Sequence, residues 1–170
     1  MKPSKLFIGV GNVLQRDDGV GVRAAELMAG LPLPPDIEVL DAGTAGMGAA
    51  SMLEDRQLVV IADAVDRGGQ PGEVFRVGPE QLRPYVESTV SLHDLHLLHA
   101  LDEMRLLNKA PEKVVVLAVQ VRDWSVGLGL SPQVEAALVP VMRLAAKELN
   151  LPPETLKHLD RQATAWKENT

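Results

Sequence analysis

The chain contains no cysteine among its 170 residues. This absence excludes a thiol nucleophile, a disulfide framework and any metal site built from thiolates. Aromatic residues are also scarce, at 3%, although hydrophobic residues of all kinds make up 46%. A chain of this length can bury a substantial core. That core must therefore be built mainly from aliphatic side chains.

Basic residues are outnumbered as well, with 17 Lys and Arg against 23 Asp and Glu, a net charge of −6 and a pI near 5.2. A chain without a basic field has no means of releasing counterions from nucleic acid, so we expect no nucleic-acid partner. Its start, MKPSKLFIGVGNVL, reads as neither a signal peptide nor a membrane span. We expect a cytoplasmic protein without membrane contact. It should be a monomer, because its helical patterns show no heptad seam.

Five apolar runs have the length and the β-branched content of strands. They lie at residues 6–10, 37–40, 58–62, 73–77 and 114–121. Three runs are nearly continuous in apolar character, which is typical of strands covered on both faces. Helical patterns alternate with them, at residues 18–30, 46–55, 91–108 and 131–149.

This alternation predicts an α/β fold: a three-layer sandwich with a mostly parallel, twisted sheet of about five strands flanked by helices. The run at 73–77 follows a GGQPG turn that is too short for a crossover, so we expect it to be an antiparallel edge strand. We assign residues 1–150 to a single α/β domain. Pro152 and Pro153 separate it from residues 151–170, which we expect to form a polar helical tail.

The first strand ends in GVGNVLQRDDG, whose G-x-G at Gly9 and Gly11 is a partial dinucleotide-binding fingerprint. The third glycine position is occupied by Leu14 instead. Asp17 and Asp18 also place negative charge where a pyrophosphate needs positive potential. We therefore expect no nucleotide cofactor.

The sequence has no G-x-S-x-G elbow and no H-E-x-x-H zinc motif. Three of its four histidines lie in SLHDLHLLHAL, where Ser91 and Asp94 resemble a capping box. This arrangement places His93 in the first turn of a helix, where the helix dipole keeps the imidazole neutral and able to bind metal. His96 and His99 point in other directions around the helix, and we expect structural or solvent-exposed roles for them.

The carboxyl ends of parallel strands share one edge of a sheet, and ligands bind there. Asp18 follows the first strand, Asp63 follows the third, and His93 opens a helix. Each residue alone has an ordinary structural explanation, such as a helix cap or a turn. Together, two carboxylates and one neutral imidazole form a ligand set suited to Zn²⁺ or Ni²⁺ that leaves open positions on the ion. Such a set is better suited to transient capture of a metal-bearing group than to tight storage.

The segments GVGNVLQRDDGVG, DAGTAGM, VVIADAVD and SLHDL, in this order and spacing, resemble the hydrogenase maturation proteases. The resemblance extends from about residue 5 to residue 149 and includes GLGLSPQVEAAL. It implies an endopeptidase whose partner is the precursor of a nickel–iron hydrogenase large subunit. Such enzymes remove a C-terminal extension from this subunit after nickel has been inserted.

The resemblance also implies roles for particular residues. The family's two metal-binding acids fall on Asp18 and Asp63 and its histidine on His93, so these three would recognise nickel carried by the substrate and take part in catalysis. The DAGTAGM segment matches a loop linked with substrate recognition. The recognition residues would be Asp41, Gly43, Thr44 and Gly46. Asp17 matches an acidic family position of less clear role.

Two mechanisms stay open at this point. Nickel could polarise the scissile carbonyl or activate water while a carboxylate takes the proton. Alternatively, Asp18 and Asp63 could act as an aspartyl protease pair that shares one proton. In either case the acids of the first loop are expected to point into the crevice toward a cation. A different class of protein, a nickel-sensing checkpoint module that binds the precursor without cutting it, would use the same ligands.

Overall fold

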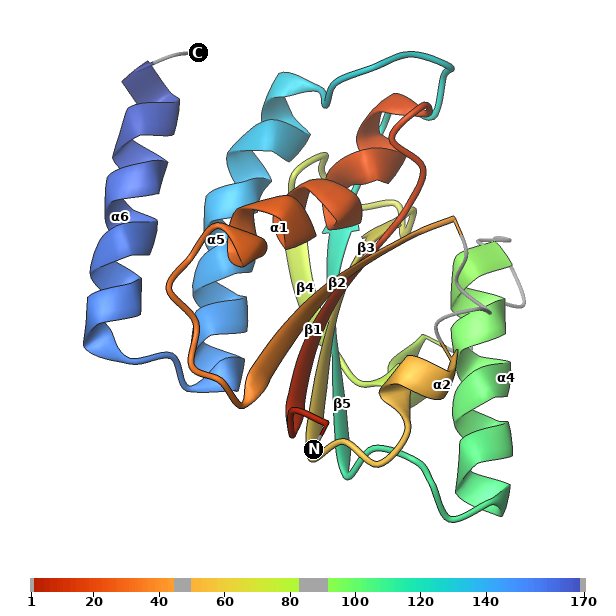
Figure 1. Cartoon of the computed structure of the whole chain (residues 1–170). Coiled ribbons are helices and arrows are strands. Elements are labelled where there is room, and N and C mark those ends of the chain that lie inside the picture. The colour runs from red at the N-terminus through yellow and green to blue at the C-terminus, as the bar shows by residue number, and fades with distance from the viewer. Residues whose placement is uncertain (1, 45–49, 83–91, 169–170) are drawn as a thin grey trace.

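The computed structural model describes residues 2–44, 50–82 and 92–168. Five strands form one sheet in the order β2-β1-β3-β5-β4 (Figure 1). Their bounds are β1 Lys5–Val10, β2 Ile37–Gly43, β3 Leu58–Val65, β4 Val74–Val77 and β5 Lys113–Gln120. All neighbours pair in parallel except β4, which lies antiparallel to β5 at one edge. The predicted mostly parallel sheet with one antiparallel edge strand is confirmed.

Helices cover both faces of this sheet (Figure 1). One layer holds η1 (Arg16–Gly19, a 3₁₀ turn), α1 (Val20–Ala29), α5 (Pro132–Leu149) and α6 (Pro153–Glu168). The other holds α2 (Ala50–Leu53), η2 (Pro79–Gln81) and α4 (Leu92–Leu106). The predicted three-layer sandwich is therefore confirmed.

Strand alternation explains the apolar character of the central strands. In β3, Val60 and Ala62 face the core beneath α1 and α5, whereas Val59 and Ile61 face the core beneath α4. Because successive side chains point to opposite faces, a strand covered on both sides must be apolar throughout. The sheet thus separates two largely aliphatic cores.

Helix α1 lies unusually close to the sheet at Gly21. A Cβ atom on Gly21 would overlap the carbonyl oxygens of Val10 and Ala62, and one on Gly9 would overlap the carbonyl oxygen of Gly21. Backbone therefore packs directly on backbone where α1 crosses β1 and β3. This contact fixes the start of α1, and with it η1, above the carboxyl edge of the sheet.

The predicted ends of two strands were too early. β2 continues to Gly43 and β3 to Val65, so Asp41 and Asp63 lie within strands rather than after them. The reason is the neighbouring backbone, because β5 pairs with β3 as far as Val65 opposite Gln120. An apolar run in the sequence does not indicate how far the neighbouring strand extends, so it does not predict where the pairing ends.

Two helix boundaries also differ from the predictions. The helix expected at 18–30 begins instead with the 3₁₀ turn η1, and α1 proper runs from Val20 to Ala29. The pattern at 46–55 corresponds to the short α2, and residues 45–49 lie outside the described residues. The helix predicted at 131–149 matches α5 to within one residue, because Pro132 occupies its first turn and Asn150 ends it at a left-handed φ of 56°.

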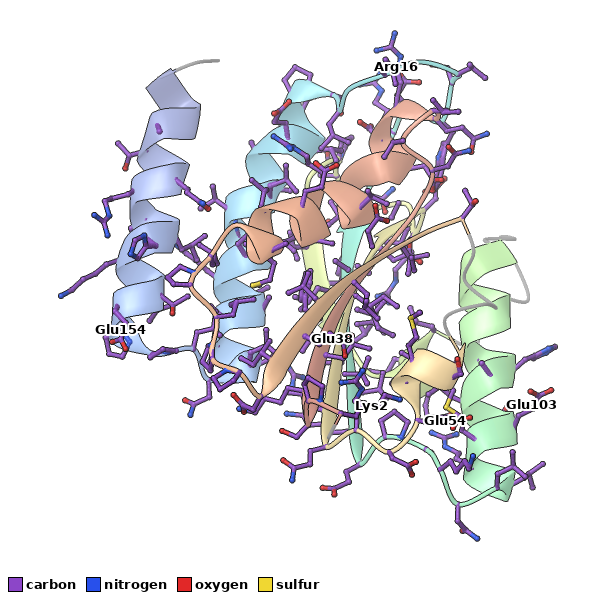
Figure 2. All side chains as sticks on the ribbon, viewed as in Figure 1. Lys2, Arg16, Glu38, Glu54, Glu103 and Glu154 are labelled. Atoms are coloured by element: carbon purple, nitrogen blue, oxygen red, sulfur yellow. The ribbon has the colours of Figure 1, made fainter. Side chains whose placement is uncertain are left out.

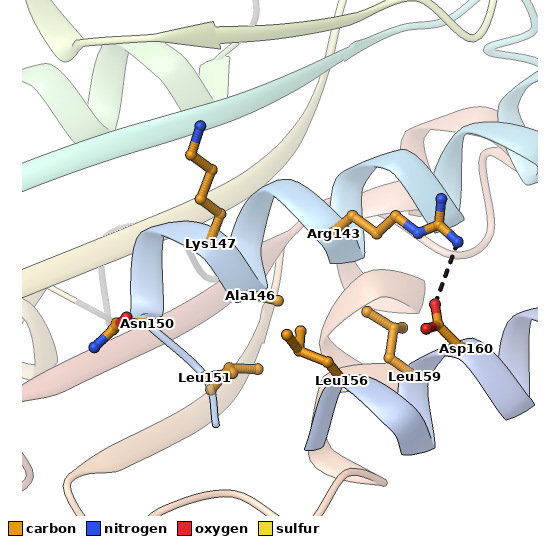
Figure 3. A pocket seen from close by; sticks show the side chains of 8 residues that line it. All are labelled: Arg143, Ala146, Lys147, Asn150, Leu151, Leu156, Leu159 and Asp160. Carbon is orange, nitrogen blue, oxygen red and sulfur yellow. Dashed lines mark hydrogen bonds and ion pairs between the residues drawn. The ribbon is translucent and has the colours of Figure 1, made fainter. Parts of the chain in front are cut away.

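Residues 153–168 form α6, which packs beside α5 (Figure 1). The buried Thr155 hydroxyl donates a hydrogen bond to the Pro32 carbonyl at 2.7 Å, and Leu159 is 4% exposed. A pocket of about 480 Å³ lies between the two helices, with an Arg143–Asp160 ion pair at its rim (Figure 3). Within the described ranges, no helix combines the length and the apolar character needed to cross a membrane.

We predict that Gly21→Ala destabilises the fold. Helix propensity alone favours alanine over glycine by about 1 kcal/mol. Overlap with two carbonyl oxygens acts in the opposite direction, and overpacking of this kind costs about 1–3 kcal/mol or more. Denaturant unfolding should therefore give a lower free energy of unfolding for Gly21→Ala. The control is Gly30→Ala, because a Cβ atom on Gly30 would lie 3.4 Å from the nearest atom outside its chain neighbours, the carbonyl oxygen of Leu27. Equal stability of the two variants would contradict the prediction.

A second prediction concerns Glu148, which accepts hydrogen bonds from Arg76 at 2.5 Å and Lys113 at 3.0 Å. The Arg76 hydrogen bond is the main cause that lowers the pKa of Glu148 from 4.5 to about 2. Since the folded pKa lies below the unfolded one, this stabilisation is present above pH 4.5 and is lost as the pH falls toward 2.

Arg76 is 45% and Lys113 56% exposed, so water screens the pairs and we expect about 1 kcal/mol at neutral pH. Urea unfolding of Glu148→Gln should show this loss at pH 7 and none near pH 2. Glu26→Gln, which removes an exposed pair with Arg23, is the control and should change little at either pH. A Glu148→Gln deficit that persists at low pH would refute the linkage.

Candidate active site

The first loop turns sharply after β1 and brings Asp18 back over the strand end. Gly11 has a φ of +144°, and a Cβ atom there would overlap the carbonyl oxygen of Asp18. The Asn12 N–H donates a hydrogen bond to Asp18 Oδ2 at 2.8 Å. Asp18 is only 4% exposed. The glycine thus allows a close approach that holds this carboxylate at the sheet edge, as the sequence predicted for a sharp turn.

Asp63 reaches the same region from the sheet itself. It is 4% exposed, and its Oδ1 accepts a hydrogen bond from the Ala64 N–H at 2.8 Å. Strand alternation places its side chain on the same face as Ile61 and Val65, toward α4. Because η1 contacts β3, Asp18 and Asp63 belong to neighbouring segments at one edge.

His93 lies in the first turn of α4, as the capping pattern predicted. The side chains of residues 92–97 are outside the described part of the structure, as is Ser91. Helix α4 ends near the start of β5 and runs back along it, so its first turn lies toward the carboxyl edge (Figure 1). His99 is exposed.

Among the side chains that the structure describes, no group of three His, Asp or Glu residues is placed to hold a metal ion. That search does not include the His93 side chain. The set of Asp18, Asp63 and His93 therefore stays a prediction.

The DAGTAGM segment begins at the end of β2 beside the first loop. Asp41 is exposed, and its Oδ1 accepts a hydrogen bond from the Gly43 N–H at 2.8 Å. Gly43 adopts a left-handed φ of 49°, and its carbonyl accepts a hydrogen bond from the Gly11 N–H at 3.0 Å. Thr44 is exposed, whereas Gly46 lies outside the described residues. The first two loops are thus joined at Gly11, which places the predicted recognition segment next to the Asp18 loop.

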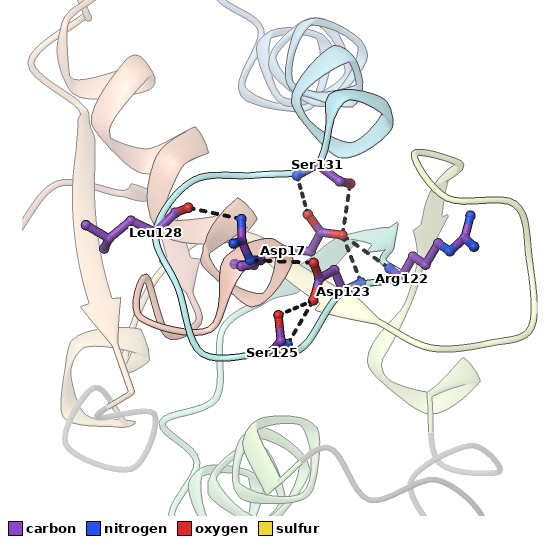
Figure 4. A network of polar contacts seen from close by, with 7 residues as sticks. Asp17, Arg122, Asp123, Ser125, Leu128 and Ser131 are labelled. Carbon is purple, nitrogen blue, oxygen red and sulfur yellow. Dashed lines mark hydrogen bonds and ion pairs between the residues drawn. The ribbon is translucent and has the colours of Figure 1, made fainter.

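Asp17 does not point toward a cation in the crevice, and that expectation for the first-loop acids was wrong for this residue. Its side chain is fully buried. Its Oδ1 accepts a hydrogen bond from the Ser131 N–H at 2.6 Å. Its Oδ2 accepts from the Ser131 hydroxyl at 3.0 Å and from the N–H groups of Arg122 and Asp123 at 3.3 and 3.1 Å (Figure 4). Asp17 is a structural anchor for the loop between β5 and α5.

The geometry of η1 separates the two adjacent acids. Successive side chains on a 3₁₀ turn point about 120° apart, so Asp17 and Asp18 cannot both face the same ligand. The carboxylate of Asp17 is directed at Ser131, and that of Asp18 accepts from Asn12. This division could not be predicted from the sequence, because the partner of Asp17 at Ser131 lies far away in the chain.

Gln120, at the end of β5, is a second residue that the sequence analysis missed. Its side chain is 3% exposed, and its Oε1 accepts hydrogen bonds from the N–H groups of Arg67 and Gly69 at 2.9 and 3.1 Å. Its Nε2 donates to Asp66 Oδ1 at 3.0 Å. Gln120 thus orders the loop that directly follows the strand carrying Asp63. No motif in the sequence marks it.

We predict that Asp17→Asn loosens the loop between β5 and α5. An amide has one acceptor oxygen, and its NH₂ group would face backbone N–H donors without an acceptor, which costs about 1–3 kcal/mol. Amide hydrogen exchange at Arg122, Asp123 and Ser131 should accelerate, and the free energy of unfolding should fall. Asp66→Asn, which alters an exposed acid that partners Gln120, is the control and should leave those three amides unchanged. Unaltered exchange in Asp17→Asn would show that the anchor does not hold the loop.

Comparison with known proteins places this arrangement in a family. The family described as hydrogenase maturation protease (HycI) matches residues 22–148. The hydrogenase 2 maturation protease of Escherichia coli (strain K12) is 33% identical over 139 residues, which cover 81% of this chain and 85% of that protein. HupD of Bradyrhizobium diazoefficiens, a hydrogenase expression/formation protein, is 30% identical over 85% of this chain and 77% of its own length.

Solved structures agree with the sequence matches. The hydrogenase maturating endopeptidase HybD from E. coli superposes with a TM-score of 0.79 at 31% identity, over 86% of this chain and 94% of that one. The hydrogenase 2 maturation peptidase from a Thaumarchaeota archaeon gives a TM-score of 0.67 at 31% identity, over 87% and 99% of the two chains. In sequence and in fold, this chain therefore belongs to the hydrogenase maturation proteases, a family of peptide-bond hydrolases.

Proposed function

We propose that this peptidase removes the C-terminal extension of a nickel–iron hydrogenase large-subunit precursor after nickel has been inserted, and that it recognises the nickel carried by that substrate. One observation carries the proposal: Asp18 and Asp63, each 4% exposed, come from adjoining segments at the carboxyl edge of the sheet. Each carboxylate accepts a backbone N–H hydrogen bond, and both belong to the edge of the sheet where ligands bind in folds of this kind. The first turn of α4, which carries His93, lies toward the same edge.

The chemistry of these groups fits an ion that arrives with the substrate. Carboxylate oxygens and a neutral imidazole are ligands that a divalent nickel ion accepts. A site of three side chains leaves coordination positions for ligands that the precursor already supplies. The ion then polarises the scissile carbonyl or activates water, and a carboxylate of Asp18 or Asp63 takes the proton.

The loop at the end of β2 supplies the recognition surface in this proposal. Asp41 and Thr44 are exposed beside the first loop, and the hydrogen bond from Gly43 to Asp41 fixes the turn. Gly46 is assigned to the same loop from the family resemblance. The cytoplasmic location and the monomeric state stay predictions.

We predict that Asp18→Asn leaves the fold intact and abolishes processing. The substitution keeps the acceptor for the Asn12 N–H but removes the charge, so binding of the ion and proton transfer should both fail. Intact mass of nickel-loaded precursor, followed over time, should show a loss of rate of about 100-fold or more. Asp55→Asn is the matched control, because Asp55 is exposed at a left-handed φ of 57° that asparagine tolerates.

The same assay includes nickel-free precursor, which wild-type protein should leave uncut. Normal processing by Asp18→Asn would remove Asp18 from the site. Cleavage of both precursor forms at equal rates would contradict recognition of nickel. Tight binding of the loaded precursor by the wild-type protein without any change in mass would instead favour the checkpoint module.

A further inference from the structure

Two loops beside the candidate site expose five large apolar side chains, which we call the loop-pair surface. Its members are Val13 (45% exposed), Leu14 (59%), Trp124 (38%), Val126 (85%) and Leu128 (73%). Single exposed apolar residues are ordinary, but a group on adjoining loops marks an interaction site.

Backbone hydrogen bonds hold the two loops side by side. The Gly127 N–H donates to the Leu14 carbonyl at 2.9 Å, and the Arg16 N–H donates to the Gly127 carbonyl at 3.0 Å. Gln15 and Gly127 pair as an isolated parallel bridge. Leu14 and Val126 each precede a paired residue, so the bridge brings these two positions of the loops next to each other.

The buried carboxylate of Asp17 fixes this pair of loops from beneath. It accepts hydrogen bonds from Arg122, Asp123 and Ser131, at both ends of the second loop. In Figure 4, Leu128 points away from Asp17 and out of this network. The polar network orders the loops in a conformation that leaves these apolar side chains exposed.

The loop-pair surface is continuous with the candidate site. Asp17 and Asp18 are consecutive in η1, so the anchor of the surface and the predicted catalytic acid share one turn. Val13 packs against that turn, because its Cα lies 3.0 Å from the position that a Cβ on Gly19 would occupy. The loop-pair surface therefore lies next to the turn that carries Asp18.

We propose that the loop-pair surface docks the precursor polypeptide through an apolar segment close to the peptide bond that is cut. The proposal rests on the proposed function, since the occupant is the same substrate. An endopeptidase must hold a polypeptide against its acids, and this apolar surface begins at the turn that carries Asp18. Arg122, which is exposed and extends outward beside the loop in Figure 4, borders the surface with positive charge. The partner segment that fits is apolar and flanked by an acidic residue or a carboxylate.

The test compares two double substitutions of matched exposure. Val126→Ser with Leu128→Ser removes the centre of the loop-pair surface. Leu106→Ser with Leu107→Ser alters side chains that are 85% and 65% exposed at the far end of α4. In Figure 2, Glu54 and Glu103 lie far from Arg16, and Glu103 belongs to the last turn of α4, which also contains Leu106. Denaturant unfolding of each variant verifies that the fold is retained.

With nickel-loaded precursor, the loop variant should raise KM about tenfold or more while kcat at saturation stays within about twofold, because it alters docking and not the acids. Leu14→Ser, on the other loop, should raise KM in the same direction. The control variant should match the wild type. An unchanged KM in the loop variants, or an equal rise in the control, would overturn the proposal.

The remaining outcomes are also decisive. If the wild-type protein binds precursor without cutting it, the proposed function fails, and Kd measured directly with the same variants still tests the surface. If the wild-type protein binds no precursor, both proposals fail. Sedimentation of the uncomplexed protein tests a second copy as the occupant: a dimer that the loop substitutions dissociate, with KM or Kd for precursor unchanged, would assign the surface to self-association and refute docking.

Discussion

The close contact between α1 and the sheet governs the whole carboxyl edge. Gly21 lets the helix backbone rest on the carbonyl groups of Val10 and Ala62, and Gly9 leaves room for the carbonyl of Gly21 itself. Side chains normally keep a helix well clear of a sheet. Because glycine has no side chain, the start of α1 can pack directly on β1 and β3. The preceding turn, η1, then contacts β3, the strand that contains Asp63.

The two aspartates of η1 place a structural anchor directly beside the acid that we propose for catalysis. A fully buried carboxylate is tolerated only when its lone pairs are satisfied, and Asp17 meets that condition with four hydrogen bonds from the loop before α5. This anchoring makes Asp18 part of a well-supported turn. Asp18 is then held at the sheet edge with little conformational freedom. The proposed catalytic role requires such a fixed position, because a catalytic group must be oriented toward the reacting atom.

The same anchor orders the loops that expose large apolar side chains to water. Exposed leucine and valine gain no burial in the isolated protein. The Asp17 network and the hydrogen bonds to Gly127 order the two loops in the conformation that exposes them. Preformed apolar surface of this kind lowers the entropy cost of binding, because the loops are ordered before the partner arrives.

By itself, the sequence determined the layers, the parallel sheet with its antiparallel edge and the family. These features depend on apolar periodicity and short motifs, which involve residues close together in the chain. It also indicated Asp18, Asp63 and His93 as candidates, because an acidic turn, the end of an apolar run and a capping pattern are local features of the sequence. Only the tertiary structure decided that Asp17 is an anchor and that Gln120 orders the loop after β3, because their partners lie more than fifty residues away in the chain. It likewise decided where β3 ends, since a strand stops where its neighbour's hydrogen bonds stop. Such contacts form between segments that are far apart in the chain, so no local sequence pattern predicts them.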